Sequence, residues 1–590
     1  MRWLANHRWS IVVPCMHGAR SAPRILLHMP FNTAVLAMSS RSLLITLLAC
    51  AVTFTAGAQD RVRLPDLGSS ADALISPQEA SQYGASMLRQ MRSMHLVMDD
   101  PQVRQYINDV GYRLVAASSD PKQHFTFFVV RDQDINAFAA PGGYIGINAG
   151  LIALTQDESE LAAVMAHEIG HIAQHHLERA FEASKKDAPL MALVLLGAIA
   201  AGTSGRNSGD AGMAVLAGGQ GLLAQRQINF TRADEAEADR VGIQTLANAG
   251  YDPEAMADFF QRMEDTLRPG SGGGSVPEML QTHPVTARRI SEARARARVL
   301  EELAKKEALP RLGNAAIVNS TVPLPYVKTP LAPDPNLGNG DKASLRYLLM
   351  RERVRVLAGD ANTLLRYYAG NFQRKGFDDT AHRYGYALAL MRSGQPAQAV
   401  AQLAPLLQRH PGNVPLQLAM AHARFEDGQH KAAFALYAQL HTLAPDDRAV
   451  SMAYADALTL GGDRAQARQA EDMLQPLLDN SDDPDLYSSY ARACDKAGLK
   501  VRAGEAYAYA SYLSGRPFDA MQQFRRLLDR PDLDYYQRAR INAHIAELTP
   551  LLLELRKRNI PTPDRQDGTA QSGQDGSDLA SRWCFSLSCK

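Results

Sequence analysis

The 590-residue chain lacks an excess of charge of either sign. Its 63 lysine and arginine residues balance 62 aspartate and glutamate residues, which leaves a formal net charge of +1. Clustered positive charge is the usual electrostatic mark of a nucleic-acid-binding protein, so the composition gives no reason to expect nucleic acid as a partner. At this length we expect two or more globular domains.

Cysteine is also scarce, with five residues in the whole chain. They are Cys15, Cys50, Cys494, Cys584 and Cys589. Their small number and irregular spacing argue against a disulfide framework and against a zinc site built from cysteines.

Long hydrophobic segments are missing after the N-terminal region. The run from Pro189 to Gly202 is glycine-rich and shorter than the ~20 residues that span a bilayer. The Ala/Gly-rich stretch from Ala211 to Ala224 has the same character. Both suit helix packing in a core, with a mobile lid or a membrane-dipping element as the alternative. We expect a mature protein that is soluble or contacts a membrane only peripherally.

The N-terminal region carries an export signal. Ser40-Arg41 precedes an apolar run from Ser42 to Phe54, and Ala56-Gly57-Ala58 supplies a small-residue cleavage site. We predict a true start at Met38 and cleavage after Ala58, so that residues 1–58 are an extension and a signal peptide. This predicts a location in the periplasm.

The motif His167-Glu168-Ile169-Gly170-His171 is the strongest chemical signal in the chain. Good helix formers without proline precede it, so we predict a helix. Residues four apart share a helix face, and His167 and His171 can therefore present two imidazoles to one metal ion. Glu168 lies beside the first imidazole, where its carboxylate can deprotonate a metal-bound water. The motif predicts a zinc metalloprotease; the alternative is a surface helix with two incidental histidines.

A second helical stretch, from Phe230 to Leu246, offers the third ligand. Glu235 and Asp239 are four apart and share a face. A site with two histidines and one glutamate needs such a carboxylate from a separate element, and a carboxylate one turn further can accept a ligand's free ring N–H. Spacing alone leaves Asp234 and Glu237 as rival ligands, and a solvated acidic first turn as the alternative without metal.

Short strands precede the motif. His124 to Val130 is typical of a strand, Asn136 to Gly143 of a turn, and Tyr144 to Asn148 of another short strand. An exposed strand beside a metal cleft can pair with an extended peptide. The residues that we expect to contact the substrate are Tyr144, Ile145 and Gly146.

Two further histidines follow the motif. His175 and His176 extend the predicted metal helix by one turn, and His175 would lie on the face of His171. Because a catalytic zinc site needs only three protein ligands, we expect structural or supporting roles for both.

Four motifs in a fixed order resemble a known family. Asn136 to Gly143, the His167–His171 motif, Glu235 to Asp239 and Thr282-His283-Pro284 follow one another as in the metallopeptidase family of the HtpX-like and CAAX prenyl proteases. The resemblance spans roughly Ser76 to Arg298. It implies a zincin-like domain with one Zn²⁺ per chain.

The resemblance also assigns roles to individual residues. It implies His167, His171 and Glu235 as zinc ligands, Glu168 as catalytic base and Asp239 as a supporting aspartate. It places His283 and Arg289 near the active site.

The part played by His283 stays open at this point. Its imidazole could occupy the fourth zinc position and hold the enzyme off. It could instead donate a hydrogen bond to the oxyanion during hydrolysis, or only pack against Pro284.

The C-terminal half contains a repeat. Gly394, Gly428 and Gly462 are 34 residues apart, as are Pro411 and Pro445. This is the period of the tetratricopeptide family, which stacks helix pairs into a solenoid with a concave binding surface. We predict a mainly α protein: an α+β protease domain at residues 59–310, a Pro/Gly-rich linker at 311–345, an α-solenoid at 346–555 and a polar tail at 556–590.

An export signal, this protease domain and these repeats together resemble exported bacterial metallopeptidases that oversee outer-membrane protein assembly. The resemblance implies misfolded or stalled envelope proteins as substrates, with the barrel assembly machinery as a partner of the repeats. Two alternatives remain: a chaperone with a latent metal site, and a general periplasmic quality-control protease.

Overall fold

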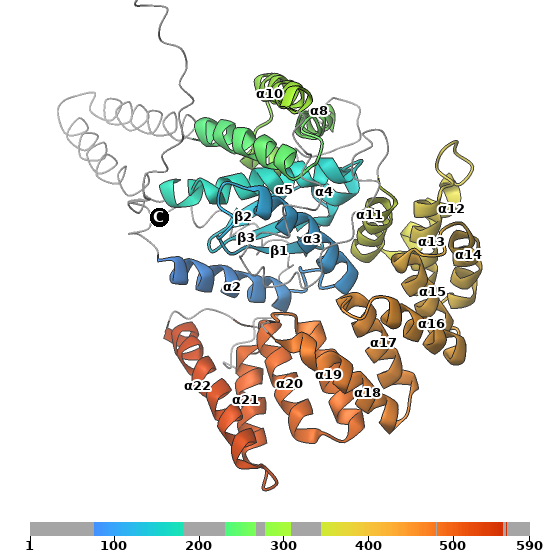
Figure 1. Cartoon of the computed structure of the whole chain (residues 1–590). Coiled ribbons are helices and arrows are strands. Elements are labelled where there is room, and N and C mark those ends of the chain that lie inside the picture. Colours follow the sequence, from blue (N-terminus) through green and yellow to red (C-terminus); the bar gives the residue numbers. More distant parts are fainter. Residues whose placement is uncertain are drawn as a thin grey trace, which may run out of the picture. The chain divides into compact units, whose positions relative to one another are not determined.

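A small mixed β-sheet lies at the centre of the N-terminal half of the computed structural model (Figure 1). The structure describes residues 76–180, 231–266, 278–307, 344–479, 481–557, 562 and 564. The predicted signal peptide, both apolar stretches and nearly all of the predicted linker and tail lie outside these residues. The sheet contains β1 (Thr126–Val130), β2 (Ala137–Ala140) and β3 (Tyr144–Asn148) in the order β1-β3-β2. β3 runs parallel to β1 and antiparallel to β2.

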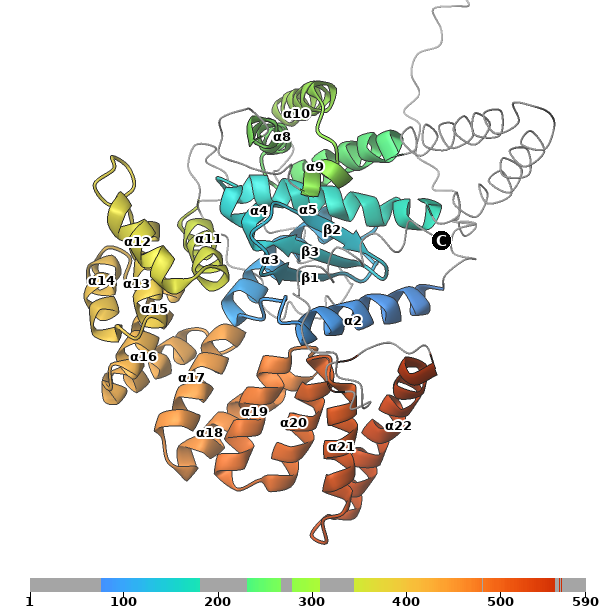
Figure 2. The same cartoon turned by 180° about the vertical axis from the view of Figure 1, so that it is seen from behind.

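Both faces of the sheet are buried. Alternate side chains of a strand point to opposite sides, so each face packs against a different part of the protein. Ile145 and Ile147 belong to the main protease core with residues of α3 and α5. Tyr144 and Phe128 pack with Leu88 of α2 on the other face. Figure 2 shows α2 on one side of the sheet and α5 on the other. The helices around the sheet are α2 (Pro77–Ser93), α3 (Pro101–Ala117), α4 (Ala149–Leu154), α5 (Glu158–Ala173), α8 (Ala255–Thr266), α9 (Glu278–Thr282) and α10 (Ala287–Glu307).

Two expectations about the strands before the metal helix are wrong: that the second strand is exposed, and that the preceding segment is a turn. β3, which contains Tyr144, Ile145 and Gly146, is the central strand and has neighbours on both edges. Its backbone groups are therefore already paired and cannot bind an added peptide strand. Ala137–Ala140, which we expected within a turn, forms β2 at the edge of the sheet. The real turn is confined to the three residues between the two strands, Pro141 to Gly143.

The C-terminal half is a helical repeat. Helices α13, α15 and α17 begin at Thr380, Val414 and Arg448, which are 34 residues apart. The turns after α13 and α15 contain Gly394 and Gly428, both with positive φ, a conformation that glycine adopts without steric cost. This half of the chain contains α11 (Leu345–Ala358), α12 (Ala361–Asn371), α13 (Thr380–Arg392), α14 (Pro396–Arg409), α15 (Val414–Glu426), α16 (His430–Leu443), α17 (Arg448–Gly461), α18 (Arg464–Leu474), α19 (Pro484–Ala497), α20 (Lys500–Leu513), α21 (Pro517–Leu528) and α22 (Tyr535–Lys557).

The first helix after the predicted linker also belongs to the protease core. Tyr347, Met350 and Val354 of α11 are buried in the same cluster as the sheet and α5. The hydroxyl of Tyr347 donates to the carbonyl of Thr155 at 2.7 Å. Together these contacts attach the repeat to the protease fold. In the parts of the chain that the structure describes, no helix is long and apolar enough to span a bilayer.

The tight turn between β2 and β3 generates a stability prediction. Gly143 has a φ of +82°, and a Cβ there would lie 1.9 Å from the carbonyl oxygen of His124. We expect Gly143→Ala to cost about 1–2 kcal/mol for the left-handed backbone and a further ~1–3 kcal/mol for the backbone collision. Denaturant unfolding of the zinc-free protein measures the loss.

Gly250 supplies the matched control. Its φ is +84°, yet nothing lies within 4 Å of the Cβ position. Gly250→Ala should therefore show only the backbone cost. Equal destabilisation by the two variants would contradict the close approach at Gly143.

Candidate metal centre

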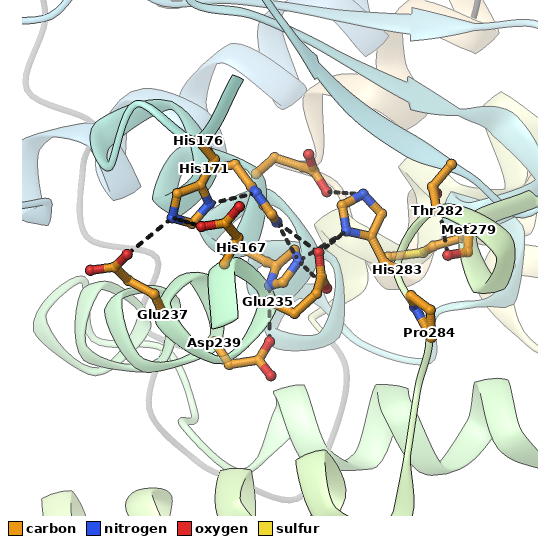
Figure 3. Close-up of polar contacts among 12 residues, drawn as sticks. His167, His171, His176, Glu235, Glu237, Asp239, Met279, Thr282, His283 and Pro284 are labelled. Carbon is orange, nitrogen blue, oxygen red and sulfur yellow. Dashed lines mark hydrogen bonds and ion pairs between the residues drawn. The ribbon is translucent and has the colours of Figure 1, made fainter. Parts of the chain in front are cut away.

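Helix α5 brings the two histidines of the HExxH motif to one place. The side chain of Asp157 caps its first turn by accepting the N–H of Glu160, and the helix then continues without interruption to Ala173. His167 and Glu168 are 2% and 1% exposed. His167 and His171 point to the same side of the helix, as their spacing requires (Figure 3).

Three other elements meet α5 at this point. The helix over residues 231–248, called the carboxylate helix below, presents Glu235 and Asp239 to the two imidazoles. His283 follows α9, and its imidazole enters the same cluster (Figure 3). Arg289 reaches the cluster from α10.

Four side chains form a ligand cluster: His167, His171, Glu235 and His283, with ligand atoms all within 4.8 Å of one another. Nε2 of His167 lies 3.0 Å from Nε2 of His171. The carboxylate of Glu235 lies 3.4 Å and 3.3 Å from these two nitrogens. Zinc bonds of about 2.0–2.1 Å place tetrahedral ligand atoms ~3.4 Å apart. The donor set and its spacing therefore fit zinc.

The structure separates Glu235 from its rivals. Asp234 and Glu237 lie near Arg179 and His176 rather than among the ligand cluster. Glu235 alone of the three carboxylates faces His167 and His171, which is the placement that the family resemblance implies and that spacing left open.

Asp239 and Arg289 support the first histidine. Asp239 Oδ1 lies 3.0 Å from Nδ1 of His167, so the opposite nitrogen, Nε2, faces Glu235. Arg289 binds both oxygens of Asp239 at 2.7 Å and approaches Glu235 Oε2 at 2.9 Å. Both carboxylates are thereby held in place by one guanidinium.

Protonation differs between the two motif histidines. Burial lowers the pKa of His167, but the contacts with Asp239 and Glu235 outweigh it and raise the pKa to about 10. Burial lowers the pKa of His171 to about 3, against the opposing contact with Glu235. Ligand histidines must be neutral. His171 is already in that form, whereas at His167 a metal must displace a proton.

The carboxylate of Glu168 lies where it can accept a hydrogen bond from a water molecule. Its carboxylate is buried, and among the described residues its Oε1 atom has no hydrogen-bond partner. Nε2 of His283 lies 3.8 Å from Oε1. A buried carboxylate oxygen beside a zinc donor set can accept a hydrogen bond from a water there. This is a second observation that fits a catalytic metal.

The predicted zinc ligands generate a direct test. We expect His171→Ala to lose stoichiometric zinc, since it removes one of three donors from a buried site. Metal analysis of the purified variant after equilibration with zinc measures this. Retention of zinc at wild-type stoichiometry and affinity would show that the ligand assignment is wrong.

Comparison with known proteins shows which family contains this chain. The model of peptidase family M48 matches residues 101–297, which include all three segments of the ligand cluster. The chain is 32% identical to the beta-barrel assembly-enhancing protease of Yersinia pestis over 497 residues, which is 84% of this chain and 93% of that protein.

Two further relatives match a shorter stretch. A putative beta-barrel assembly-enhancing protease of Vibrio cholerae is 41% identical over 260 residues, 44% of this chain and 52% of that protein. The mitochondrial metalloendopeptidase OMA1 of Schizosaccharomyces pombe is 30% identical over 212 residues, 36% of this chain and 55% of that protein. The chain is thus a zinc-dependent metalloendopeptidase, and it belongs to peptidase family M48, in the group that contains the beta-barrel assembly-enhancing proteases.

Proposed function

We propose that this chain is an exported endopeptidase that cleaves misfolded or stalled envelope proteins during the assembly of outer-membrane β-barrels. The observation that carries the hydrolytic part is the ligand cluster, with the buried Glu168 beside it. The link to barrel assembly is supported by the relatives named beta-barrel assembly-enhancing protease, one of which matches over most of both chains. We propose a location in the periplasm because the sequence predicts a signal peptide.

In this proposal His167, His171 and Glu235 hold one zinc ion. Zinc bound there would polarise the scissile carbonyl and make a water acidic enough to deprotonate near neutral pH. Glu168 takes that proton and passes it to the leaving amine. Asp239 keeps His167 oriented, because its Oδ1 lies 3.0 Å from Nδ1 of the imidazole.

We propose β2, in place of β3, as the strand that binds the substrate. In the order β1-β3-β2, β2 has a neighbour on one edge only among the residues that the structure describes, and α5 packs against it. An extended peptide can add to such an edge through main-chain hydrogen bonds. We therefore propose that substrate pairs along Ala137–Ala140, beside the metal helix.

We propose that the helical repeat selects the substrates and partners. The 34-residue spacing of α13, α15 and α17 supports the predicted tetratricopeptide array, whose concave surface suits protein binding. The barrel assembly machinery is the proposed partner. A chaperone role of the same surface is the second candidate function, because protein binding there does not require hydrolysis.

Glu168→Gln separates hydrolysis from metal binding. The amide cannot accept a proton from water, so we expect zinc content to stay at the wild-type level and cleavage of an unfolded model protein to fall by about 10²–10⁴-fold. Proteolysis near the wild-type rate would rule out Glu168 as the base. Full complementation of a deletion strain by the inactive variant would favour the chaperone function instead.

His283 generates a prediction whose sign decides between its roles. Its Nδ1 lies 2.8 Å from Glu235 Oε1 and 3.4 Å from Nε2 of His167, which is the spacing of a fourth zinc ligand. We therefore expect His283 to act as a latch and His283→Ala to increase cleavage of an unfolded model protein.

Stability and zinc content must match the wild type for this comparison. A loss of cleavage would indicate an oxyanion donor. Unchanged cleavage would contradict both functional roles and leave only packing against Pro284.

A further inference from the structure

Each imidazole of the HExxH motif has a second nitrogen that faces away from Glu235. Nδ1 of His167 lies 3.0 Å from Asp239 Oδ1. Nδ1 of His171 lies 2.8 Å from Nδ1 of His176 (Figure 3). A metal-bound histidine almost always donates its other ring N–H to an acceptor, which fixes its tautomer and ring orientation. For His171 the group in that position is another imidazole.

Two carboxylates determine which nitrogen of His176 can accept. Its Nε2 lies 3.3 Å from Glu237 Oε2 and 3.8 Å from Asp234 Oδ1. An ionised carboxylate only accepts hydrogen bonds, so Nε2 of His176 carries the proton and Nδ1 keeps its lone pair. That lone pair accepts the Nδ1–H of His171. Nε2 of His171 is then unprotonated on the side of Glu235, which is the form that binds a metal.

Arg179 holds both carboxylates behind His176. Its Nη2 lies 2.8 Å from Glu237 Oε2 and 3.1 Å from Asp234 Oδ1. A guanidinium between two carboxylates cancels one of their two negative charges and occupies acceptor positions that a cation would use. The group formed by His176 and these carboxylates is therefore better suited to orienting His171 than to holding a second cation.

An interruption of the helix after α5 brings His176 next to His171. On an uninterrupted helix His175, and not His176, would lie beside His171. The structure corrects our expectation of one continuous helix: α5 ends at Ala173, and residues 174 and 175 form a turn. His175 has a φ of +53°, a left-handed conformation that is uncommon for residues other than glycine. The helix resumes at His176, which is 5% exposed.

We propose that His176 is a positioning residue for zinc binding: it accepts the Nδ1–H of His171 and directs the Nε2 lone pair of that ligand into the metal site. The inference rests on the proposed role of His171 as a zinc ligand. It assigns no contact between His176 and the substrate.

The test compares zinc affinity in two substitutions of the full-length protein. His176→Phe keeps an aromatic ring but removes the acceptor, whereas His176→Asn places a carbonyl oxygen near the position of Nδ1. Competition with a chelator of known affinity gives the zinc Kd. We expect the phenylalanine variant to bind zinc about 10–100-fold more weakly and the asparagine variant to recover most of the loss. Thermal unfolding of the zinc-free proteins shows whether the two variants are equally folded.

His175→Asn is the matched control, because asparagine tolerates the left-handed conformation and the variant also removes one histidine beside the site. It should leave the zinc Kd unchanged. The inference is overturned by wild-type affinity in His176→Phe, or by an equal loss in both His176 variants, which would indicate packing alone. It is also overturned if wild-type protein binds two zinc ions and the variants bind one with unchanged affinity. Failure of the wild type to bind zinc would instead reject the proposed ligands.

Discussion

The protease half of the molecule depends on one buried carboxylate. Glu235 is 4% exposed, and three imidazoles and the guanidinium of Arg289 lie within 3.4 Å of its oxygens. Burial alone would raise the pKa of Glu235, but hydrogen bonds led by that from His167 outweigh it and hold the pKa far below its usual range. A buried negative charge requires this density of partners. α5, the carboxylate helix and the start of α10 must therefore meet at this point.

The imidazoles of His167 and His171, which face this carboxylate, are themselves held by further polar groups. His167 is backed by Asp239, which Arg289 holds with two hydrogen bonds. His171 is backed by His176, whose other nitrogen faces carboxylates that Arg179 holds. On both sides an acceptor fixes the imidazole and an arginine fixes the acceptor. A ring fixed in this way loses less freedom when it binds a metal, which is why such outer contacts affect metal affinity.

Local sequence was sufficient for the parts of the site that depend on helical spacing. The i, i+4 pairs of α5 and of the carboxylate helix could be predicted because residues four apart share a face. The choice of Glu235 over its neighbours came only from the family resemblance, since spacing cannot tell which side of a helix faces a distant element. The role of His176 was not visible, because it depends on a left-handed residue that ends α5 early.

The order of the strands was not predictable either, because it depends on pairing between separate segments of the chain. β2 has the sequence AFAA and is followed by Pro-Gly-Gly, so its local pattern is typical of a turn. Its strand character comes from pairing with β3, and the central position of β3 comes from pairing with β1, a strand before β2 in the chain. The attachment of α11 to the protease core through Tyr347 is likewise a long-range contact. The helical repeat was predictable because the glycines at its turns recur every 34 residues in the sequence.

A crystal structure of the zinc-loaded protein, with anomalous diffraction measured on both sides of the zinc absorption edge, tests the central claim most directly. The account predicts one zinc peak per chain, bound by Nε2 of His167, Nε2 of His171 and the carboxylate of Glu235. Absence of a peak there in zinc-saturated, proteolytically active crystals would contradict it. So would a single peak among His176, Asp234 and Glu237.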